Sequence, residues 1–438
     1  MTPVIYLYLS FPSVRPRPYS GSSYASLRHL HHRHQSTMVH LPSELWQEIL
    51  EYATFVFGEL EEQIYDPFCC PPVHELELAI KGSQFSRYNF IHVSRTFYML
   101  SIPYLYRTIL VDGPIWWKRL EDCLTVNKRR VGNQPDTPLN TSFIKRIHFM
   151  TAWALNRALD GEQIDLPNLT ICISTKANIV AYESETRHPF CMRFKAPQLR
   201  ALEGVFETAS NCLHAAAHFP FLTSCFYTTP FSIPLLRPPP YDGSSIRLEA
   251  TTIGREWPFH QDLHLDLASL RAIKIATYTT NFSSLYAIGH QMQFLDIANS
   301  HLYHPNRDIS IELSNLPALV TLIIDIAILG YKWHLPDGHA HSSLKRVGFI
   351  VPSKQQRHSV YRDHFDKFDG YRFPALEQLR ILEMPVCRRL AAQNPGRVAN
   401  WSDELGSRGV RLEAADGSLL AHLPTTATYP PYGHRYLP

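Results

Sequence analysis

The chain has 438 residues, of which 45% are hydrophobic and 18% are charged. This composition excludes a chain that is disordered or collagen-like as a whole, because such chains are poor in apolar residues or periodic in glycine. The formal net charge is +3, from 42 basic and 39 acidic residues. That value is too close to neutral to indicate a nucleic-acid partner.

The beginning of the chain differs in composition from the rest. Residues 1–43 contain no acidic residue, and the short apolar run from Val4 to Phe11 is followed by Pro12. An acid-free stretch with arginine and serine is similar in composition to a transit peptide, but prolines interrupt any amphipathic helix in it. We expect residues 1–38 to be a disordered leader, with a mitochondrial or a secretory signal as the alternatives. Since no apolar stretch reaches spanning length, we expect no membrane partner.

The first organised segment has the spacing of a helix. Leu41, Leu45, Ile49 and Ala53 recur every four residues, which predicts an amphipathic helix with one apolar face. Pro42 suits the first turn of this helix, where a missing backbone N–H costs nothing.

A second helical pattern runs from Phe90 to Ser101, and we expect Pro103 to end that helix and to open a short third turn. The strand-like run Thr108–Val111 follows. Between the two helices, residues 54–89 are rich in proline, phenylalanine and Gly-Ser. We expect them to form a looped-out insertion.

Three short motifs in this region carry a family resemblance: Leu-Pro-x-Glu-Leu at 41–45, Val-Ser-Arg-x-Phe at 93–97 and Leu-Tyr-Arg-Thr-Ile at 105–109. Together they resemble an F-box of the kind common in fungal proteins. The resemblance implies an F-box-like domain at 39–111 that binds a Skp-family adaptor and, through it, a cullin. Phe97 departs from the family, which usually has tryptophan there. The implied adaptor-binding residues are Leu41, Pro42, Leu45, Ile49, Leu50, Val93, Ser94, Phe97, Leu105 and Tyr106.

The region that follows is a predicted linker, residues 112–140. It opens on the turn signal Asp112-Gly113, and the apolar residues Trp117, Leu120 and Leu124 alternate with charged ones. This pattern predicts an amphipathic helix, followed by a loop.

Residues 141–420 contain a recurring pattern, apolar-x-x-apolar-x-apolar. The nine intervals from residue 144 to residue 376 have a mean of about 26 residues, within the 20–29 of leucine-rich repeats. We therefore predict an α/β (α+β overall) fold in which a three-helix F-box module precedes an irregular leucine-rich-repeat-like solenoid, with a disordered tail at 421–438. A plain α/β or all-β domain is the alternative. The pattern starts at Ile144, Leu270, Met292, Leu319, Leu344 and Leu376, and more weakly at Leu169, Leu199, Leu222 and Leu248.

Side chains alternate along a strand, so the positions between the apolar ones are expected on the concave surface of the solenoid. The side chains found there lean basic and predict contacts to an acidic or phosphorylated segment of a target. The alternative is that they form ordinary solvated strand faces, and a register error of one residue would exchange inside for outside. The candidate substrate-binding residues are Arg146, His148, Lys274, Asp296, Arg346, Gln378 and Arg380.

Enzyme motifs are absent from the sequence: it has no phosphate-binding glycine loop, no Gly-x-Ser-x-Gly and no His-Glu-x-x-His. We expect no catalytic activity, no metal and no cofactor, and we expect the eight cysteines to be mainly small core residues of a cytoplasmic or nuclear protein. The resemblance implies the substrate-recognition subunit of an SCF-type cullin–RING ubiquitin ligase. The alternative is a non-catalytic leucine-rich-repeat scaffold with no ligase role, whose helical module caps the solenoid. A hydrolase built on the C-terminal half is a third hypothesis.

Overall fold

The structure is a computed structural model. The predicted leader at 1–38 and the end of the predicted tail, from residue 425, lie outside the described residues, whereas the tail's first residues are described. The described residues are 41–71, 73–131, 140–159, 163–174, 189–206, 209–227, 247–253, 267–275, 283–297, 309–325, 331–351, 361 and 364–424.

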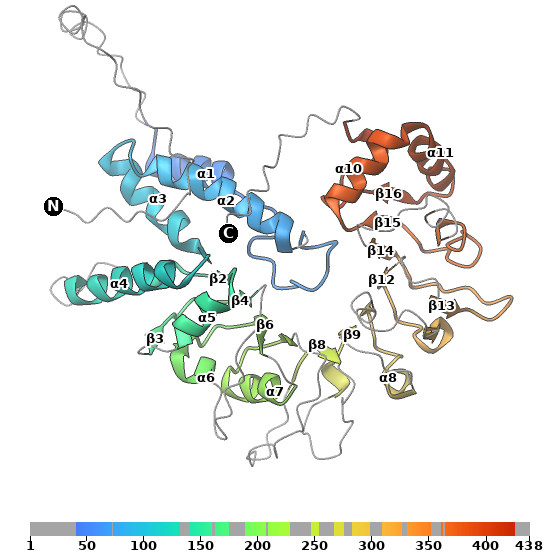
Figure 1. Cartoon of the computed structure of the whole chain (residues 1–438), viewed down its shortest axis with the longest axis horizontal. Coiled ribbons are helices and arrows are strands. Elements are labelled where there is room, and N and C mark those ends of the chain that lie inside the picture. The colour runs from blue at the N-terminus through green and yellow to red at the C-terminus, as the bar shows by residue number, and fades with distance from the viewer. Residues whose placement is uncertain are drawn as a thin grey trace, which may run out of the picture.

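Helices surround a large sheet in this α/β fold (Figure 1). The helices are α1 (Ser43–Thr54), α2 (Val73–Phe90), α3 (Arg95–Arg107), α4 (Pro114–Val131), α5 (Ala152–Leu159), α6 (Pro189–Arg193), α7 (Ala209–His218), α8 (Ser283–Ala287), α10 (Met384–Gln393) and α11 (Pro395–Gly406). The strands of the main sheet are β1 (Thr108–Val111), β2 (Arg146–Phe149), β4 (Ile171–Ser174), β6 (Ala201–Phe206), β7 (Ser224–Tyr227), β8 (Ala250–Ile253), β9 (Ala272–Ile275), β10 (Phe294–Asp296), β12 (Thr321–Asp325), β14 (Arg346–Ile350), β15 (Gln378–Ile381) and β16 (Arg411–Glu413).

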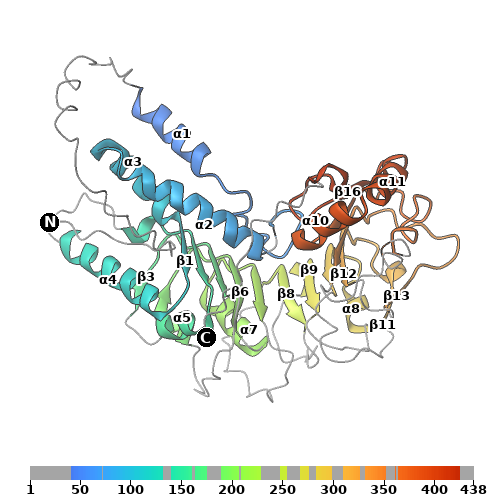
Figure 2. The same ribbon diagram turned by 45° about the horizontal axis from the view of Figure 1, so that its top comes forward.

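In the described part of the chain the main sheet has twelve strands, and their order in space is their order along the chain. Each neighbouring pair is parallel. Two small parallel pairs accompany it: β3 (Ile164–Asp165) with β5 (Phe194–Lys195), and β11 (Ile309–Glu312) with β13 (Tyr331–His334). The main strands follow an arc, with α5, α7 and α8 on its outer side (Figures 1 and 2).

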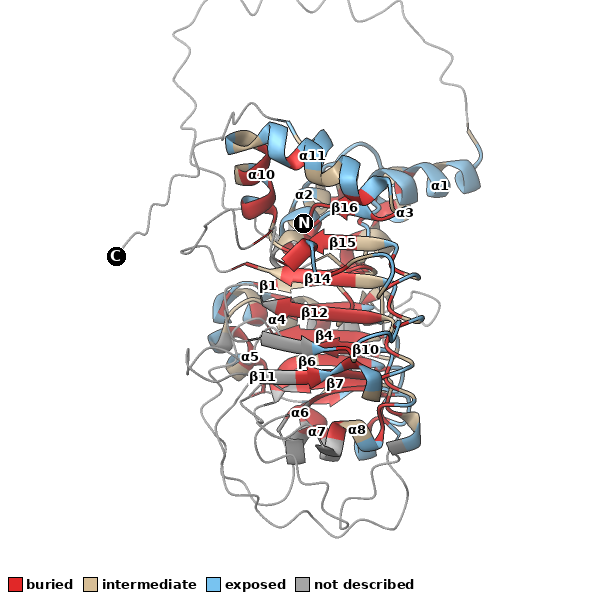
Figure 3. Ribbon diagram, turned by 90° about the vertical axis from the view of Figure 1, so that its right-hand side faces the viewer, coloured by how far each residue is buried: buried red, intermediate tan, exposed pale blue. Residues whose placement is uncertain are grey.

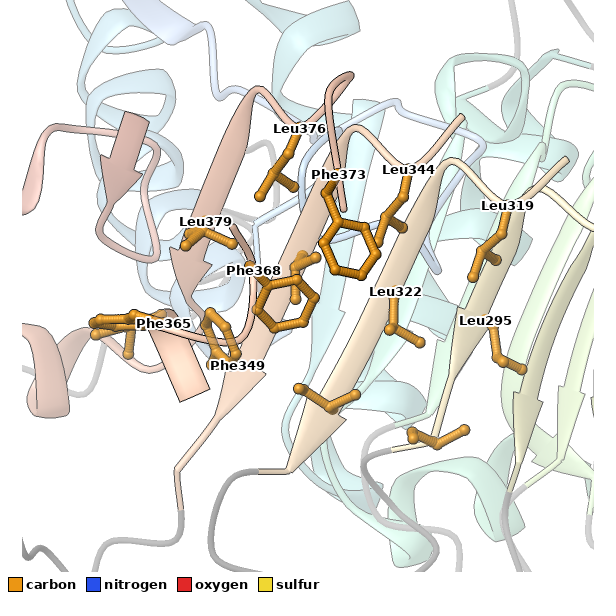
Figure 4. Packing of buried hydrophobic residues seen from close by; sticks show 14 of the residues in the cluster. Leu295, Leu319, Leu322, Leu344, Phe349, Phe365, Phe368, Phe373, Leu376 and Leu379 are labelled. Carbon is orange, nitrogen blue, oxygen red and sulfur yellow. The ribbon is translucent and has the colours of Figure 1, made fainter. Parts of the chain in front are cut away.

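The apolar pattern explains where the strands lie. Each of the ten predicted pattern starts lies two residues before a strand of the main sheet, and all ten side chains are buried. The fourth position of the pattern is also buried, and across neighbouring strands these residues form one rung, for example Leu295, Leu322, Val347 and Leu379. Figure 4 shows side chains of both kinds in layers along the sheet. Stacked strands thus bury a continuous core that no single strand could bury alone.

Of two further predicted helices, one is present as expected and the other differs in its bounds. The linker helix is confirmed as α4, which buries Trp117, Leu120 and Leu124. The predicted helix Phe90–Ser101 is wrong in its bounds: α3 begins after Ser94 and continues through Pro103 to Arg107. A proline removes one backbone hydrogen bond, and burial of the last turn of α3 in the core compensates for that loss.

The largest difference from the prediction is in the insertion. Residues 54–89 were expected to loop out, but α2 fills 73–90 and packs on α1, α3 and β1. Its buried side chains Leu76, Ile80 and Arg87 share one helical face. Residues 55–71, which we call the inner segment, lie inside the arc, in blue in Figure 1. They stay there because their apolar and acidic side chains match the sheet face beneath them.

Candidate functional site

The first candidate surface lies on α1 and at the start of α3. Leu45 is 42% exposed, Ile49 is 45% exposed and Val93 is 61% exposed, and Pro42 and Ser94 are exposed as well. Figure 3 shows α1 pale blue over much of its length. Five of the ten expected adaptor-binding residues are therefore open to solvent in the isolated chain.

The other five expected residues are less accessible. Leu41 and Phe97 are half-buried, whereas Leu50, Leu105 and Tyr106 are buried. Leu105 and Tyr106 belong to the same core cluster as the first strands of the sheet. These three buried side chains can shape the surface but cannot touch a partner directly.

Aromatic contacts hold α1 against α3. The rings of Trp46 and Phe97 meet edge to face with centroids 4.8 Å apart, and Phe90 lies 6.4 Å from Phe97. The hydroxyl of Tyr104 donates a hydrogen bond of 3.1 Å to the carbonyl of Gln47. Phe97, smaller than the tryptophan usual in the family that the motifs resemble, is thus an internal contact between the helices.

Sequence reasoning missed part of the exposed apolar surface. Tyr52 is 89% exposed and continues the face of Leu45 and Ile49, since the three are spaced by four and three residues. We call these three residues the α1 stripe. Met99 on α3 is also exposed. Tyr52 could have been found from its spacing of three residues from Ile49. It was missed because the recurrence that predicted the helix counts every fourth residue and so includes Ala53 instead.

The second candidate surface is the inner face of the sheet. The seven expected target-binding residues lie in two rungs of this face. One rung holds Arg146, Arg346 and Gln378, and the other holds His148, Lys274, Asp296 and Arg380. The alternative of solvated strand faces is wrong for most of them, because only Lys274, Arg346 and Gln378 are even partly exposed.

At the N-terminal end of the sheet, Arg146 is fully buried and reaches the inner segment. Its Nη1 donates to the carbonyl of Glu59 at 3.0 Å and lies 3.5 Å from the carbonyl of Gly58. Two carbonyl acceptors on one guanidinium fix the start of the inner segment against β2. Burial of this charge lowers the pKa of Arg146 below its ordinary value.

His148 lies beside Arg146 on β2 and is buried against α2. Its Nε2 lies 3.1 Å from Oε1 of Glu77. Burial, with the nearby charges of Arg146 and Lys81, lowers the pKa of His148 to about 3. The imidazole is therefore neutral near pH 7, and His148 acts as a packing contact between sheet and helix.

Glu59 anchors the inner segment to the helices as well. Its Oε2 accepts from Arg87 at 2.8 Å and from Arg107 at 3.1 Å, and all three residues are buried. Burial by itself raises the pKa of a carboxyl group, but the hydrogen bond from Arg87 and the two positive charges hold the pKa of Glu59 below its ordinary value. No local pattern in the sequence predicts this cluster.

The far end of the inner face binds the middle of the inner segment. Nη2 of Arg346 lies 2.8 Å from Oδ2 of Asp66, and its guanidinium lies 5.3 Å from the ring centre of Phe68. Nη1 of Arg380 donates to the carbonyl of Pro67 at 2.8 Å. Arg380 also lies over the Phe68 ring, at 4.5 Å.

Two of the expected residues at this end pair with the last strand. Arg380 donates twice to Oε2 of Glu413, at 3.0 and 2.6 Å, and Gln378 donates to Oε1 of Glu413 at 3.2 Å. Glu413 on β16 therefore neutralises Arg380 whether or not the inner segment is in place.

Apolar contacts cover the middle of the face. Tyr65 lies between Phe226 and Phe294, with ring centroids 5.6 and 5.1 Å away. Ile64 and Phe68 are buried in the same cluster. Burial, together with nearby carboxylates, raises the pKa of Tyr65 to about 12. This tyrosine is a neutral packing group.

Lys274 and Asp296, the two remaining expected residues, also lie in this central part. Lys274 pairs with Glu203 at 2.6 Å and lies over the ring of Phe226. Asp296 is buried on β10. Both residues belong to the floor of the face, beneath the inner segment.

The described residues hold no group of three or more side chains that could bind a metal ion. Among the described helices, none has the length and apolar character needed to cross a bilayer. All eight cysteines are free, and six of them are buried. No protein-family model and no curated protein matches the chain.

Proposed function

We propose that this chain is the substrate-recognition subunit of an SCF-type cullin–RING ubiquitin ligase, with the F-box-like region at 39–111 bound to a Skp-family adaptor. The observation that carries the proposal is the exposed α1 stripe. A three-helix unit that served only as packing would turn such a face toward the sheet. Here Leu45, Ile49 and Tyr52 face solvent, although the same module buries Leu105 and Tyr106 in the sheet core. Neighbouring exposed apolar side chains of this kind are typical of a protein interface.

The buried half of the module supports a division of roles. Leu45, Ile49 and Val93 would contact the adaptor, and Pro42 and Ser94 would lie at the rim of that contact. Leu50, Leu105 and Tyr106 would be positioning residues, which set the angle between α1 and α3. The ligase chemistry would belong to other subunits, and this chain would contribute proximity and orientation.

We also propose that the parallel sheet is an irregular leucine-rich-repeat-like solenoid. Its support is the agreement of strand order with chain order, together with the buried apolar residue two positions before ten of the twelve described strands of the main sheet. A stack of repeats with one strand each has this arrangement. Target recognition would then belong to the inner face of the arc.

The scaffold alternative has one observation in its favour. α3 continues directly into β1, and α2, α3 and α4 all pack on that edge strand, as a cap of a solenoid would. A cap explains the buried side of the module and leaves the α1 stripe unexplained. Binding of an adaptor therefore distinguishes the ligase subunit from the scaffold.

The test is co-purification of a Skp-family adaptor with the full chain from cells. We expect the wild type to recover the adaptor and Leu45→Asp/Ile49→Asp to lose it, because charges would be buried in the interface. Ile115→Asp, at a residue 66% exposed on α4, is the matched control and should keep the adaptor. Equal recovery by the wild type and the double variant, or no adaptor with either, contradicts the proposal.

A further inference from the structure

The inner segment is strongly acidic and carries apolar side chains between its charges. Residues 55–71 contain Glu59, Glu61, Glu62 and Asp66 and no lysine or arginine. Ile64, Tyr65 and Phe68 are interspersed with them. An acidic segment with aromatic side chains is a distinct chemical class of peptide.

The inner face provides a matching receptor for each kind of group. Arg346 pairs with Asp66, and Arg200 pairs with Glu62 at 3.1 Å. Phe226 and Phe294 flank Tyr65. Among the described residues, the carboxylate partner of Arg346 is Asp66 alone, so without the inner segment this arginine would face an open surface.

Two arginines donate hydrogen bonds to backbone carbonyls of the inner segment. Every peptide has such carbonyls, so these two contacts do not depend on its side chains. Arg146 and Arg380 bind the carbonyls of Glu59 and Pro67, at opposite ends of the sheet. These contacts require a peptide that can place two backbone carbonyls where those of Glu59 and Pro67 lie. The charge pair at Arg346 and the rings of Phe226 and Phe294 would then select its side chains.

The attachment of the inner segment differs from that of a strand. Apart from a bond from Phe55 to Tyr52 of α1, its backbone hydrogen bonds are turns within the segment, such as those from Asp66 to Gln63 and from Cys70 to Asp66. In the described chain, no backbone–backbone hydrogen bond joins it to the sheet. Its release would therefore break side-chain contacts, including the pairs of Glu59 with Arg87 and Arg107, and three arginine–carbonyl contacts, but none of the hydrogen bonds between the strands of the sheet.

From these observations we propose that the inner face is a binding surface for an acidic peptide with aromatic side chains, and that residues 59–70 occupy it in cis as a tethered stand-in for that peptide. The proposal deepens the target-recognition half of the proposed function and rests on it only for calling the bound peptide a ligase target. A tethered segment acts at an effective concentration of the order of millimolar. A target must therefore outcompete it, and a free peptide binds poorly while the segment is in place.

The probe is a fluorescein-labelled synthetic peptide with the sequence of residues 57–71, measured by anisotropy against the full chain. Asp66→Ala/Phe68→Ala removes two anchors of the tethered copy and leaves the sheet side chains intact. We expect this released variant to bind the peptide at least tenfold more tightly than the wild type does. A peptide of the same composition in scrambled order should not bind. Equal affinity of the wild type and the folded released variant, or equal binding of the scrambled peptide, overturns the proposal.

A third variant tests the receptor side. Arg346→Glu, added to the released variant, should weaken peptide binding at least tenfold, because it places a carboxylate opposite Asp66 of the peptide. Lys195→Glu, at a side chain 64% exposed on β5 of the small β3–β5 pair, is the matched control and should change binding less than twofold. Unchanged binding after Arg346→Glu contradicts the assigned surface.

Native-state hydrogen exchange of the wild type tests the release without a variant. The amides of Asp66, Cys69 and Cys70 donate bonds within the inner segment. We expect them to exchange at least a hundredfold faster than the amides of β12 and β14. Exchange at the same rate as those strands would show that the segment leaves only on global unfolding, and would overturn the proposal.

The outcomes separate this proposal from the ligase assignment. Adaptor recovery with no peptide binding by the folded released variant removes the inner-face proposal and leaves the ligase assignment intact. Peptide binding without adaptor recovery supports a peptide-binding protein with no ligase role.

Discussion

Asp66, which follows the first helix, lies 2.8 Å from the guanidinium of Arg346 on β14, near the far end of the sheet. With Glu59 held at β2 by Arg146, this pair makes the inner segment a bridge across the arc. Strands β2 and β14, which are not neighbours in the sheet, are thereby connected. The relative placement of the helical module and the last strands is therefore supported by this insertion as well as by the continuous sheet.

Glu59 should be among the most sensitive polar positions. Glu59→Gln leaves Arg87 and Arg107 buried without their negative partner, and we expect the free energy of unfolding to fall by about 3–5 kcal/mol. Urea unfolding measures this. Glu404→Gln, which breaks an exposed pair with Arg408, is the control and should change stability by less than about 1 kcal/mol. Equal effects of the two variants would show that the Glu59 cluster is not a structural anchor.

His148 should make the fold sensitive to acid. Its pKa is about 3 in the folded chain and ordinarily about 6.5, so between these values the unfolded state binds the proton more readily. Stability is then fully present above pH 6.5 and falls as the pH decreases from 6.5 towards 3, by up to about 1.4 kcal/mol per pH unit. His148→Gln should show a shallower loss from pH 6.5 to 4.5 in urea unfolding. The groups around position 148, Glu77, Arg146 and Lys81, are the same in the wild type and the variant. If the free energy of unfolding depended on pH equally in both proteins, a neutral buried His148 would be contradicted.

The split among the expected adaptor residues gives a third prediction. Leu50→Ala removes a buried side chain and should lower the free energy of unfolding by about 2–5 kcal/mol. Leu45→Ala, at an exposed position on the same helix, should lower it by less than about 1 kcal/mol while weakening adaptor binding. Thermal unfolding and an adaptor pull-down on both variants provide the two readouts. A larger loss of stability at Leu45 than at Leu50 would contradict the described packing of α1.

Gly289 should not tolerate an added side chain, because successive strand units are closely stacked at this position. A Cβ there would collide with the backbone carbonyl of Asn315, which precedes the next strand unit. We expect Gly289→Ala to lower the free energy of unfolding by about 1–3 kcal/mol. Gly396→Ala, in α11 with open space around it, should leave stability unchanged or raise it by up to about 1 kcal/mol. A neutral result at Gly289 would show that the units are less closely stacked than described.

The strands could be predicted from the sequence because their pattern is local. Leu319 and Leu322, for instance, are both buried by the same stacking of neighbours that repeats at every unit. Alternation also placed Arg346 and Arg380 on one face of the sheet, because side chains of a strand alternate with period two. These features depend only on residues a few positions apart.

The inner segment could not be predicted in this way. Tyr65 and Phe68 show no helical or strand period, and what buries them are residues of β7, β10, β14 and β15. The same holds for Glu59, whose partners Arg87 and Arg107 are far away in sequence. The sequence does contain one relevant signal: the insertion has four acidic residues, and several predicted outward strand positions are arginines. Their pairing cannot be inferred from the sequence, because only the folded arc brings the two groups together.

The most direct test of the proposed function is a calorimetric titration of the purified full chain with a purified Skp-family adaptor. We expect a complex of one adaptor per chain, with binding at least a hundredfold weaker for Leu45→Asp/Ile49→Asp and unchanged for Ile115→Asp. Absence of binding by the folded wild-type chain, or equal affinity of the wild type and the double variant, would contradict it.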